Sequence, residues 1–135
     1  AGANITHEIS ILGSIGHFVS INSAVEVDLE GQVNAEVIAG RQISGTGGSV
    51  DFMRAAKASR GGRSIIAMTA TAKVDAVSRI VPKVEMVTAL RTDVDIVVTE
   101  YGVADLRHAT RQKRREALID IAHPDFRATL RDAIA

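Results

Sequence analysis

The sequence predicts a three-layer α/β/α domain, in which a mixed β-sheet lies between helices. Short segments rich in valine and isoleucine alternate with longer segments whose apolar residues recur at helical spacing. Residues 94–99 form a nearly continuous apolar run, which is typical of a strand covered on both faces. With 135 residues, 46% of them apolar, the chain is long enough for one hydrophobic core and too short for two ordinary domains. We therefore interpret residues 1–135 as a single domain.

The first part of the chain predicts a short helix and a β-hairpin. Thr6 is a candidate N-cap for a helix that ends near Gly13. Residues 18–29 alternate apolar and polar side chains, which is the period of a strand. The Glu30-Gly31 pair predicts a turn, and residues 32–38 are then the returning strand. We expect these two segments to pair antiparallel.

The rest of the chain alternates between loops, strands and helices. A glycine-rich loop at residues 45–48 precedes a predicted helix from Ser49 to about Ala58, and a strand is expected at residues 64–68. Two short strands are predicted at residues 77–81 and 85–88. A helix over residues 110–122 and a last helix beginning at Pro124 complete the fold.

Composition excludes several classes of function. Sixteen basic residues balance sixteen acidic ones, so the net charge of zero gives no general attraction to nucleic acid or to an anionic membrane. The chain has no cysteine, which excludes disulfides, a thiolate zinc site and a cysteine nucleophile. The sequence shows no apolar run of the roughly 20 residues that span a bilayer, and no signal-peptide pattern at its start. We expect a cytoplasmic protein.

The loop formed by Gly45, Thr46, Gly47 and Gly48 is the first candidate binding site. Residues without Cβ let backbone amides approach a ligand, and the following helix N-terminus favours negative charge. The loop lacks the lysine of a nucleotide-binding P-loop, and Val50 stands where a dinucleotide fingerprint has its third glycine. From the residues alone, a plain strand-to-helix turn and a ligand loop are equally supported.

Three polar groups along the chain each have two interpretations. Asn22 lies in an apolar strand pattern, where its amide either bonds internally or orients a catalytic carboxylate or substrate. Glu26 and Asp28 alternate on one strand face, which usually means a solvated face and less often an acid/base pair. Glu100, followed by Tyr101 and Gly102, ends a buried strand, where either a turn or a site residue is common.

Metal and nucleic-acid sites are not predicted. The four histidines lack the i, i+4 spacing of a helical metal site. Residues 107–115 form one basic cluster, which is usually a solvated helix face and less often a phosphate or partner contact. Aromatic side chains that would stack on bases do not interleave with it.

Several segments in one consistent order resemble the C-terminal domain of acetyl-CoA hydrolase/transferase proteins. The resemblance extends over nearly the whole chain from Phe18 onward. It rests on residues 22–28 (NSAVEVD), 31–33 (GQV), 44–52 (SGTGGSVDF), 61–67 (GGRSIIA), 78–82 (SRIVP), 93–107 (DVDIVVTEYGVADLR) and 122–127 (AHPDFR). One departure is the run MTATA at residues 68–72, where many relatives have Leu-Pro-Ser-Thr.

The resemblance implies a CoA-transferase fold of the NagB/RpiA-like type and an enzyme of class I. Such enzymes transfer CoA between an acyl-CoA and a small carboxylic acid, passing through an anhydride and a glutamyl-CoA thioester. The nucleophilic glutamate is expected upstream, in an N-terminal domain missing from this chain. Glu8, within residues 6–9 (THEI), is only superficially similar to the segment that carries it. No residue of this chain is then catalytic, and a homodimer is expected.

By the same resemblance, Asn22 would help to position the glutamate, and residues 45–48 would contact the thioester or pantetheine region of coenzyme A. Three alternatives stay open at this point. One is an acyl-CoA hydrolase, and another is a CoA- or nucleotide-binding module without catalysis. A subunit-interface domain is a third possibility.

Overall fold

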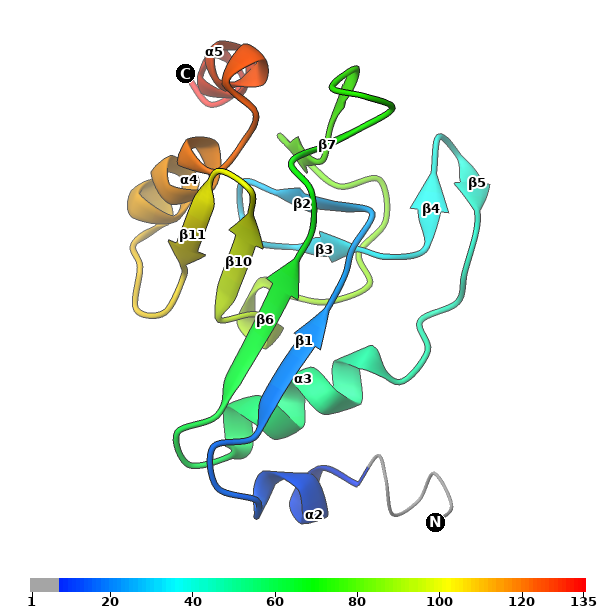
Figure 1. Ribbon diagram of the computed structural model, residues 1–135, viewed down its shortest axis with the longest axis vertical. Helices are drawn as coiled ribbons and strands as arrows, with labels where there is room; N and C mark the ends of the chain where they lie inside the picture. The colour runs from blue at the N-terminus through cyan, green and yellow to red at the C-terminus, as the bar shows by residue number, and fades with distance from the viewer. Residues whose placement is uncertain (1–7) are drawn as a thin grey trace.

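The computed structural model describes residues 8–135. Its central sheet has the strand order β1-β6-β10-β11, with β1 at Val19–Asn22, β6 at Arg63–Ala67, β10 at Ile96–Thr99 and β11 at Gly102–Asp105. The first three strands run parallel, and β11 returns antiparallel to β10 (Figure 1). The mixed sheet within an α/β fold is therefore confirmed. Strand β11 was not predicted, because the tight turn after β10 hides it in the sequence.

A second, smaller sheet lies behind the first. Its order is β3-β2-β9, with β2 at Glu26–Asp28, β3 at Val33–Asn34 and β9 at Ile80–Val81. The antiparallel pairing of β2 with β3 confirms the predicted hairpin. The single strand expected at residues 18–29 is wrong, since β1 and β2 belong to different sheets. Arg79 accounts for the break, because its guanidinium donates to the carbonyls of Ala24 and Val25 between the two strands.

Four helices complete the described chain: α2 (Ile9–Gly13), α3 (Ser49–Ala58), α4 (Arg111–Asp120) and α5 (Pro124–Asp132). Local caps explain where they begin. The side chain of Glu8 caps α2 by accepting from the amide of Ser10, while the predicted cap Thr6 lies outside the described residues. Thr110 caps α4, and His123 caps α5 with a proline in its first turn. The helices predicted at residues 49–58, 110–122 and from Pro124 are thus confirmed.

Two small hairpins project from this body. Strands β4 (Val37–Ile38) and β5 (Arg41–Gln42) form one, and β7 (Thr71–Ala72) and β8 (Val77–Ser78) form the other. The returning strand predicted at residues 32–38 is thus divided between β3 and β4, and the strand predicted at 77–81 between β8 and β9. The strand expected at residues 85–88 does not form. Instead, a single bridge joins Ala89 to Val33, and a 3-10 helix follows at Arg91–Asp93.

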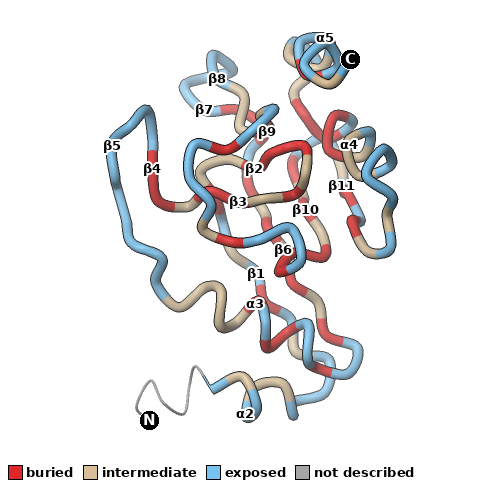
Figure 2. Tube along the Cα trace, turned by 180° about the vertical axis from the view of Figure 1, so that it is seen from behind, coloured by how far each residue is buried: buried red, intermediate tan, exposed pale blue. Residues whose placement is uncertain are grey.

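The central sheet is covered on one face. Helix α3 packs against β1 and β6, α4 packs against β11, and the smaller sheet shares the same core (Figures 1 and 2). On this covered face Ser20, Ile66, Val97 and Ala104 are at most 5% exposed. On the other face Val19 is 47%, Ile21 66% and Val103 65% exposed. We call the second face the open face; it consists of Val19, Ile21, Ile65, Ala67, Ile96, Val98 and Val103.

The layer that the three-layer prediction places over the open face is not formed by residues 8–135. Register brings Ile21, Ile65 and Ile96 into one row across three parallel strands. Parallel strands normally have both faces covered, so an apolar row left exposed marks a surface that another layer can pack against.

None of the helices in the described chain is long and apolar enough to cross a membrane.

Candidate functional site

Asn22 is the last residue of β1, at the carboxyl edge of the parallel strands. Open α/β sheets commonly bind ligands at this edge. The side chain is half-buried, and its Nδ2 donates to Ser20 Oγ at 2.8 Å. An amide can make more hydrogen bonds than this one, so Asn22 retains capacity for an outside partner. The structure therefore does not seal Asn22 in the core.

The glycine loop lies between β5 and α3, as predicted. Gly47 has a φ of +58°, the left-handed region that glycine adopts without strain. A Cβ built on Gly45 or Gly47 would meet no atom within 4 Å, so close packing inside the described chain does not require glycine at either position. Gly48 is the N-cap of α3 and supplies no side-chain hydrogen bond to the first turn. No side chain at the N-cap occupies the amides of this turn, whose residues 49–51 are partly buried, and uncapped amides at a helix N-terminus can bind an oxyanion.

Asn22 and the glycine loop are held by neighbouring elements. Helix α3, which begins at the loop, packs against β1 and β6. Phe18, just before β1, stacks on Phe52 in the first turns of α3, with ring centroids 6.4 Å apart. Within residues 8–135, no hydrogen bond joins Asn22 directly to the loop. The structure therefore places both on the β1 side of the domain without a direct link between them (Figure 1).

Glu100 lies in the turn between β10 and β11, at the same edge of the sheet. Its two carboxylate oxygens accept from the amide of Ala70 at 2.9 and 3.0 Å. Thr99 Oγ1 donates to the carbonyl of Ile121 at 2.6 Å and accepts from the amide of Tyr101 at 3.1 Å. These contacts tie the turn to the segment after β6 and to the end of α4. The structural interpretation of this turn is therefore well supported.

A cluster of ring and cationic side chains beside this turn was not found from the sequence. Tyr101 and His123 pack edge to face at 5.5 Å, and His123 packs against Phe126 at 6.0 Å. The guanidinium of Arg127 lies 5.7 Å from the centroid of the Tyr101 ring. His123 Nδ1 accepts from the amide of Asp125 at 3.1 Å, which makes it the cap of α5. The sequence feature that could have indicated this cluster is the histidine directly before Pro124.

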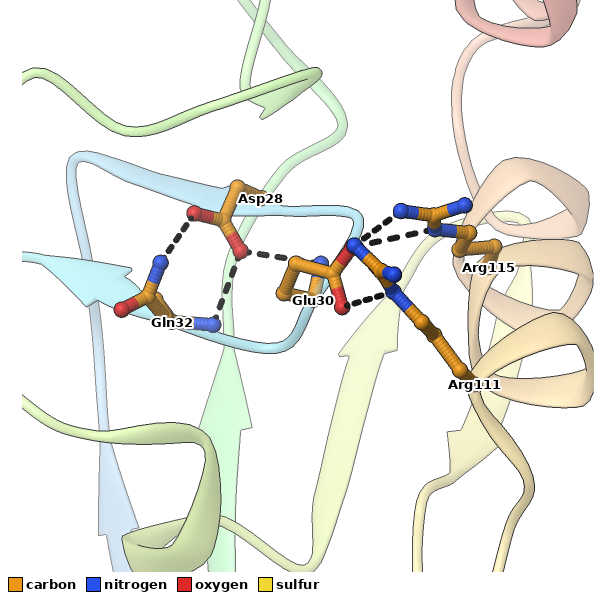
Figure 3. Close-up of polar contacts among 5 residues, drawn as sticks. All are labelled: Asp28, Glu30, Gln32, Arg111 and Arg115. Carbon is orange, nitrogen blue, oxygen red and sulfur yellow. Dashed lines mark hydrogen bonds and ion pairs between the residues drawn. The ribbon is translucent and has the colours of Figure 1, made fainter. Parts of the chain in front are cut away.

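The turn after β2 carries a dense polar network (Figure 3). Asp28 is fully buried and accepts from the amides of Glu30 and Gln32, each at 3.0 Å, and from Gln32 Nε2 at 3.0 Å. The predicted solvated face is therefore wrong for Asp28. It is a turn residue whose lone pairs are all directed into the chain, which also excludes the acid/base pair. Glu26 is likewise engaged, accepting from Asn34 Nδ2 at 3.0 Å.

The same network joins the turn to helix α4. Arg111 Nε donates to both carboxylate oxygens of Glu30 at 3.0 and 3.1 Å, and Arg115 Nε donates at 3.1 Å. The Arg111 hydrogen bond, supported by Arg115, lowers the pKa of Glu30 against the opposing effect of burial. Part of the basic cluster at residues 107–115 thus has a structural role. Arg107 has one too, since it binds Asp105 and lowers the pKa of that carboxyl to about 2.

Residues 8–135 contain no candidate metal-binding site. No three histidine, aspartate or glutamate side chains come together there in an arrangement that could hold an ion. The site that the structure offers is therefore built from an amide side chain and backbone amides. Such groups bind and orient oxygen atoms of a ligand.

Comparison with known proteins identifies the relatives of this domain. Residues 1–134 match the family described as the acetyl-CoA hydrolase/transferase C-terminal domain. A 4-hydroxybutyrate coenzyme A transferase of Clostridium kluyveri is 55% identical over 117 residues, which cover 84% of this chain and 27% of that protein.

Two solved structures share the fold. RipA from Yersinia pestis is 41% identical with a TM-score of 0.90, covering 96% of this chain and 30% of the other. A 4-hydroxybutyrate CoA-transferase from Porphyromonas gingivalis is 46% identical with a TM-score of 0.81, covering 97% of this chain and 30% of the other. The chain spans less than a third of the length of these relatives. On this evidence the chain belongs to the acetyl-CoA hydrolase/transferase C-terminal domain family.

Proposed function

We propose that this chain is the C-terminal domain of an enzyme that transfers CoA between an acyl-CoA and a small carboxylic acid. The observation that carries the proposal is the glycine loop, which presents free amides at the start of α3 in a chain of this family. A thioester carbonyl gains negative charge when a nucleophile attacks it, and backbone amides stabilise that charge. Residues 45–48 would supply such donors, and Asn22 would orient the attacking carboxylate.

The proposed reaction uses a glutamate outside this chain. Its carboxylate attacks the thioester carbonyl, CoA leaves as the thiolate, and an acyl-glutamyl anhydride remains. The thiolate then attacks the glutamyl carbonyl, which releases the first carboxylic acid and leaves a glutamyl-CoA thioester. A second carboxylate reverses the sequence. Each step exchanges one activated acyl group for another, so no external energy source is needed.

The glutamates of this chain support a nucleophile that lies elsewhere. Within residues 8–135 each glutamate side chain already accepts a hydrogen bond from this chain. The acceptors are Glu8, Glu26, Glu30, Glu36, Glu85, Glu100 and Glu116. We therefore expect the 135-residue chain alone to show no acyl exchange and no borohydride-trapped or mass-detected glutamyl-CoA adduct. Multiple turnovers, or an adduct on any of these residues, would place the nucleophile here and contradict the proposal.

The rest of a longer polypeptide is proposed to cover the open face. Exposed apolar rows on parallel strands are the physical support, because such sheets are normally covered on both faces. Family relatives about three times as long provide the polypeptide for such a layer. A homodimer of the longer protein belongs to the same proposal. Light scattering should show that the 135-residue chain associates at high concentration, and a strictly monomeric chain would count against the covering layer.

The glycine loop is tested in a full-length polypeptide that carries this chain. Gly45→Val should fold normally, because Gly45 does not have a positive φ and its Cβ direction is open. It should nevertheless lower CoA-dependent turnover at least tenfold by blocking approach to the amides. Gly47→Val tests the same loop with added backbone strain. Gly16→Val is the matched control, since Gly16 is also open but lies before β1. Unchanged turnover in Gly45→Val would remove the loop from the site.

Asn22→Ala is tested in the same polypeptide. Loss of the orienting amide should lower turnover with little change in melting temperature, because Asn22 makes one hydrogen bond and is half-buried. Omitting the acceptor acid separates transferase from hydrolase, since only a hydrolase then releases CoA continuously. A large fall in stability with unchanged turnover per folded molecule would assign Asn22 a structural role instead.

A further inference from the structure

Two adjoining cavities lie where the 3-10 helix Arg91–Asp93 meets the turn after β2 and the first turns of α4. Their volumes are about 390 and 420 Å³, and Arg91 and Arg114 line both of them. We call the two cavities together the basic groove. The cationic side chains that line it are Arg91, Arg107, Arg111, Arg114 and Lys57.

The basic groove carries an excess of positive charge. It is lined by these five cationic side chains and by two carboxylates, Glu30 and Asp95. Both carboxylates already have partners, because Glu30 binds Arg111 and Arg115, and Asp95 accepts from Lys57 Nζ at 2.7 Å. The chain as a whole has no net charge, so the excess is a local property of the groove. Such a groove attracts an anion.

Arg91 and Arg114 have no carboxylate partner within residues 8–135. The one hydrogen bond found there for either guanidinium group is long, from Arg114 Nη2 to the carbonyl of Ala109 at 3.5 Å. A guanidinium has five N–H donors in a planar fork, which fits two oxygens of a phosphate at once. Most of these donors are unused in both residues. Arg107, by contrast, is paired with Asp105.

Gly31 allows these two arginines to approach one another. It is buried in the turn after β2 and has a φ of +90°, which favours glycine. A Cβ built on Gly31 would lie 3.5 Å from Arg91 Cβ and 3.5 Å from Arg114 Cδ. The stems of both arginines therefore pack against the same point of the backbone. Packed stems have less conformational entropy left to lose when a ligand binds.

The basic groove is separate from the proposed site. Asp95, in its wall, directly precedes β10, so the groove lies at the amino edge of the parallel strands. Asn22 ends β1 at their carboxyl edge. Lys57 is in the last turn of α3, whereas the glycine loop precedes the first turn. Figure 1 shows α4 and β11 at the side of the sheet opposite β1. A ligand in the groove is therefore bound away from the proposed site.

We propose that the basic groove binds a diphosphate group, either free or as part of a nucleoside diphosphate. Arg91 and Arg114 each hold phosphate oxygens through the guanidinium fork, and Arg111 adds positive charge beside them. Two phosphates match two unpaired guanidinium groups, whereas a single phosphate or carboxylate would leave one of them without a partner. The inference does not depend on the proposed function, because it concerns a different part of the domain.

The test is calorimetric binding of inorganic pyrophosphate and of ADP to a full-length polypeptide that carries this chain. Saturating CoA is present in both titrations, so that the CoA site of the proposed reaction is already occupied. Both ligands should bind at physiological ionic strength, where contacts between exposed, distant charges are largely screened. The two affinities identify the source of the diphosphate. ADP binds more tightly if the groove takes a nucleoside diphosphate, and pyrophosphate does if the groove takes the free ion.

Substitutions locate the bound diphosphate. Arg91→Gln should weaken pyrophosphate binding about tenfold, since it removes charged donors from the groove. Arg114→Gln should do the same, and the double variant should bind neither ligand. Arg60→Gln is the matched control, because Arg60 is an exposed arginine after α3 that does not line the groove. It should change the affinity less than about twofold. If Arg114→Gln does not fold, Arg91→Gln alone makes the test, because Arg91 is exposed.

Three results would overturn the proposal. One is that the folded polypeptide binds neither pyrophosphate nor ADP. Another is an equal loss of affinity in Arg60→Gln and Arg91→Gln, which would mean a general attraction to positive charge. The third is binding that occurs only without CoA, which would place the diphosphate in the CoA site. None of these results alters the tests of acyl transfer, so the proposed function stands or falls separately.

Discussion

The two faces of the central sheet differ although the same strands form both. On the covered face Ile66 and Val97 are fully buried against α3, α4 and the smaller sheet. On the open face Ile21 and Val103 are 66% and 65% exposed. Side chains of adjacent residues point to opposite faces, so one strand serves two environments. The difference teaches that residues 8–135 complete the core on one side only and leave an apolar row exposed on the other.

The largest expected effect comes from the covered face. Ile66→Ala removes a fully buried side chain from the core and should lower the free energy of unfolding by about 2–5 kcal/mol. Urea denaturation of the purified chain measures it. A loss below about 1 kcal/mol would show that the covered face is loosely packed and would weaken the contrast between the faces.

A smaller effect is expected on the covered side of the central sheet, where Glu30 joins the turn after β2 to helix α4. Glu30→Gln leaves Arg111 and Arg115 without their carboxylate and should cost about 1 kcal/mol, since the Glu30 side chain is 24% exposed. The lowered pKa means that this contribution is present above the ordinary glutamate value of 4.5 and is lost as the pH falls further. Glu116→Gln, at an exposed position of α4, is the control. Equal losses in both variants would contradict a special role for Glu30.

The open face should respond to the same kind of substitution much less. Ile21→Ala, matched to Ile66→Ala, should change the free energy of unfolding of the 135-residue chain by less than about 0.5 kcal/mol. It should also reduce association of the chain at high concentration, because it removes exposed apolar area. Denaturation and light scattering on the same samples check both. A loss as large as that of Ile66→Ala would mean that this face is covered after all.

The smallest effect concerns Asp105, the last residue of β11, which pairs with Ile96 of the open face. Arg107 lowers the pKa of Asp105 from 3.8 to about 2, so the pair stabilises the folded chain above pH about 4 and loses this effect as the pH falls toward 2. Because the Asp105 side chain is 48% exposed, solvent screening limits the contribution to a few tenths of a kcal/mol. Asp105→Asn should therefore flatten the stability curve in this window, whereas Asp132→Asn, at an exposed position of α5, should not.

The sequence by itself determined the features that depend on neighbouring residues. Thr110 and Pro124 mark the starts of α4 and α5, because caps and prolines act within one helical turn. The glycine loop at residues 45–48 and the following helix are local in the same sense. The strand β10, which is buried on one face, and the family resemblance also follow from residues that are contiguous in the chain.

Only the tertiary structure decided the features that join distant segments. Residues 18–29 divide between two sheets because Arg79, more than fifty positions away, binds the carbonyls between β1 and β2. Asp28 is buried because the turn folds back on it, and Glu30 finds its partners on α4. The open face has the same origin. Its residues are brought together by strand register, which local periodicity does not encode.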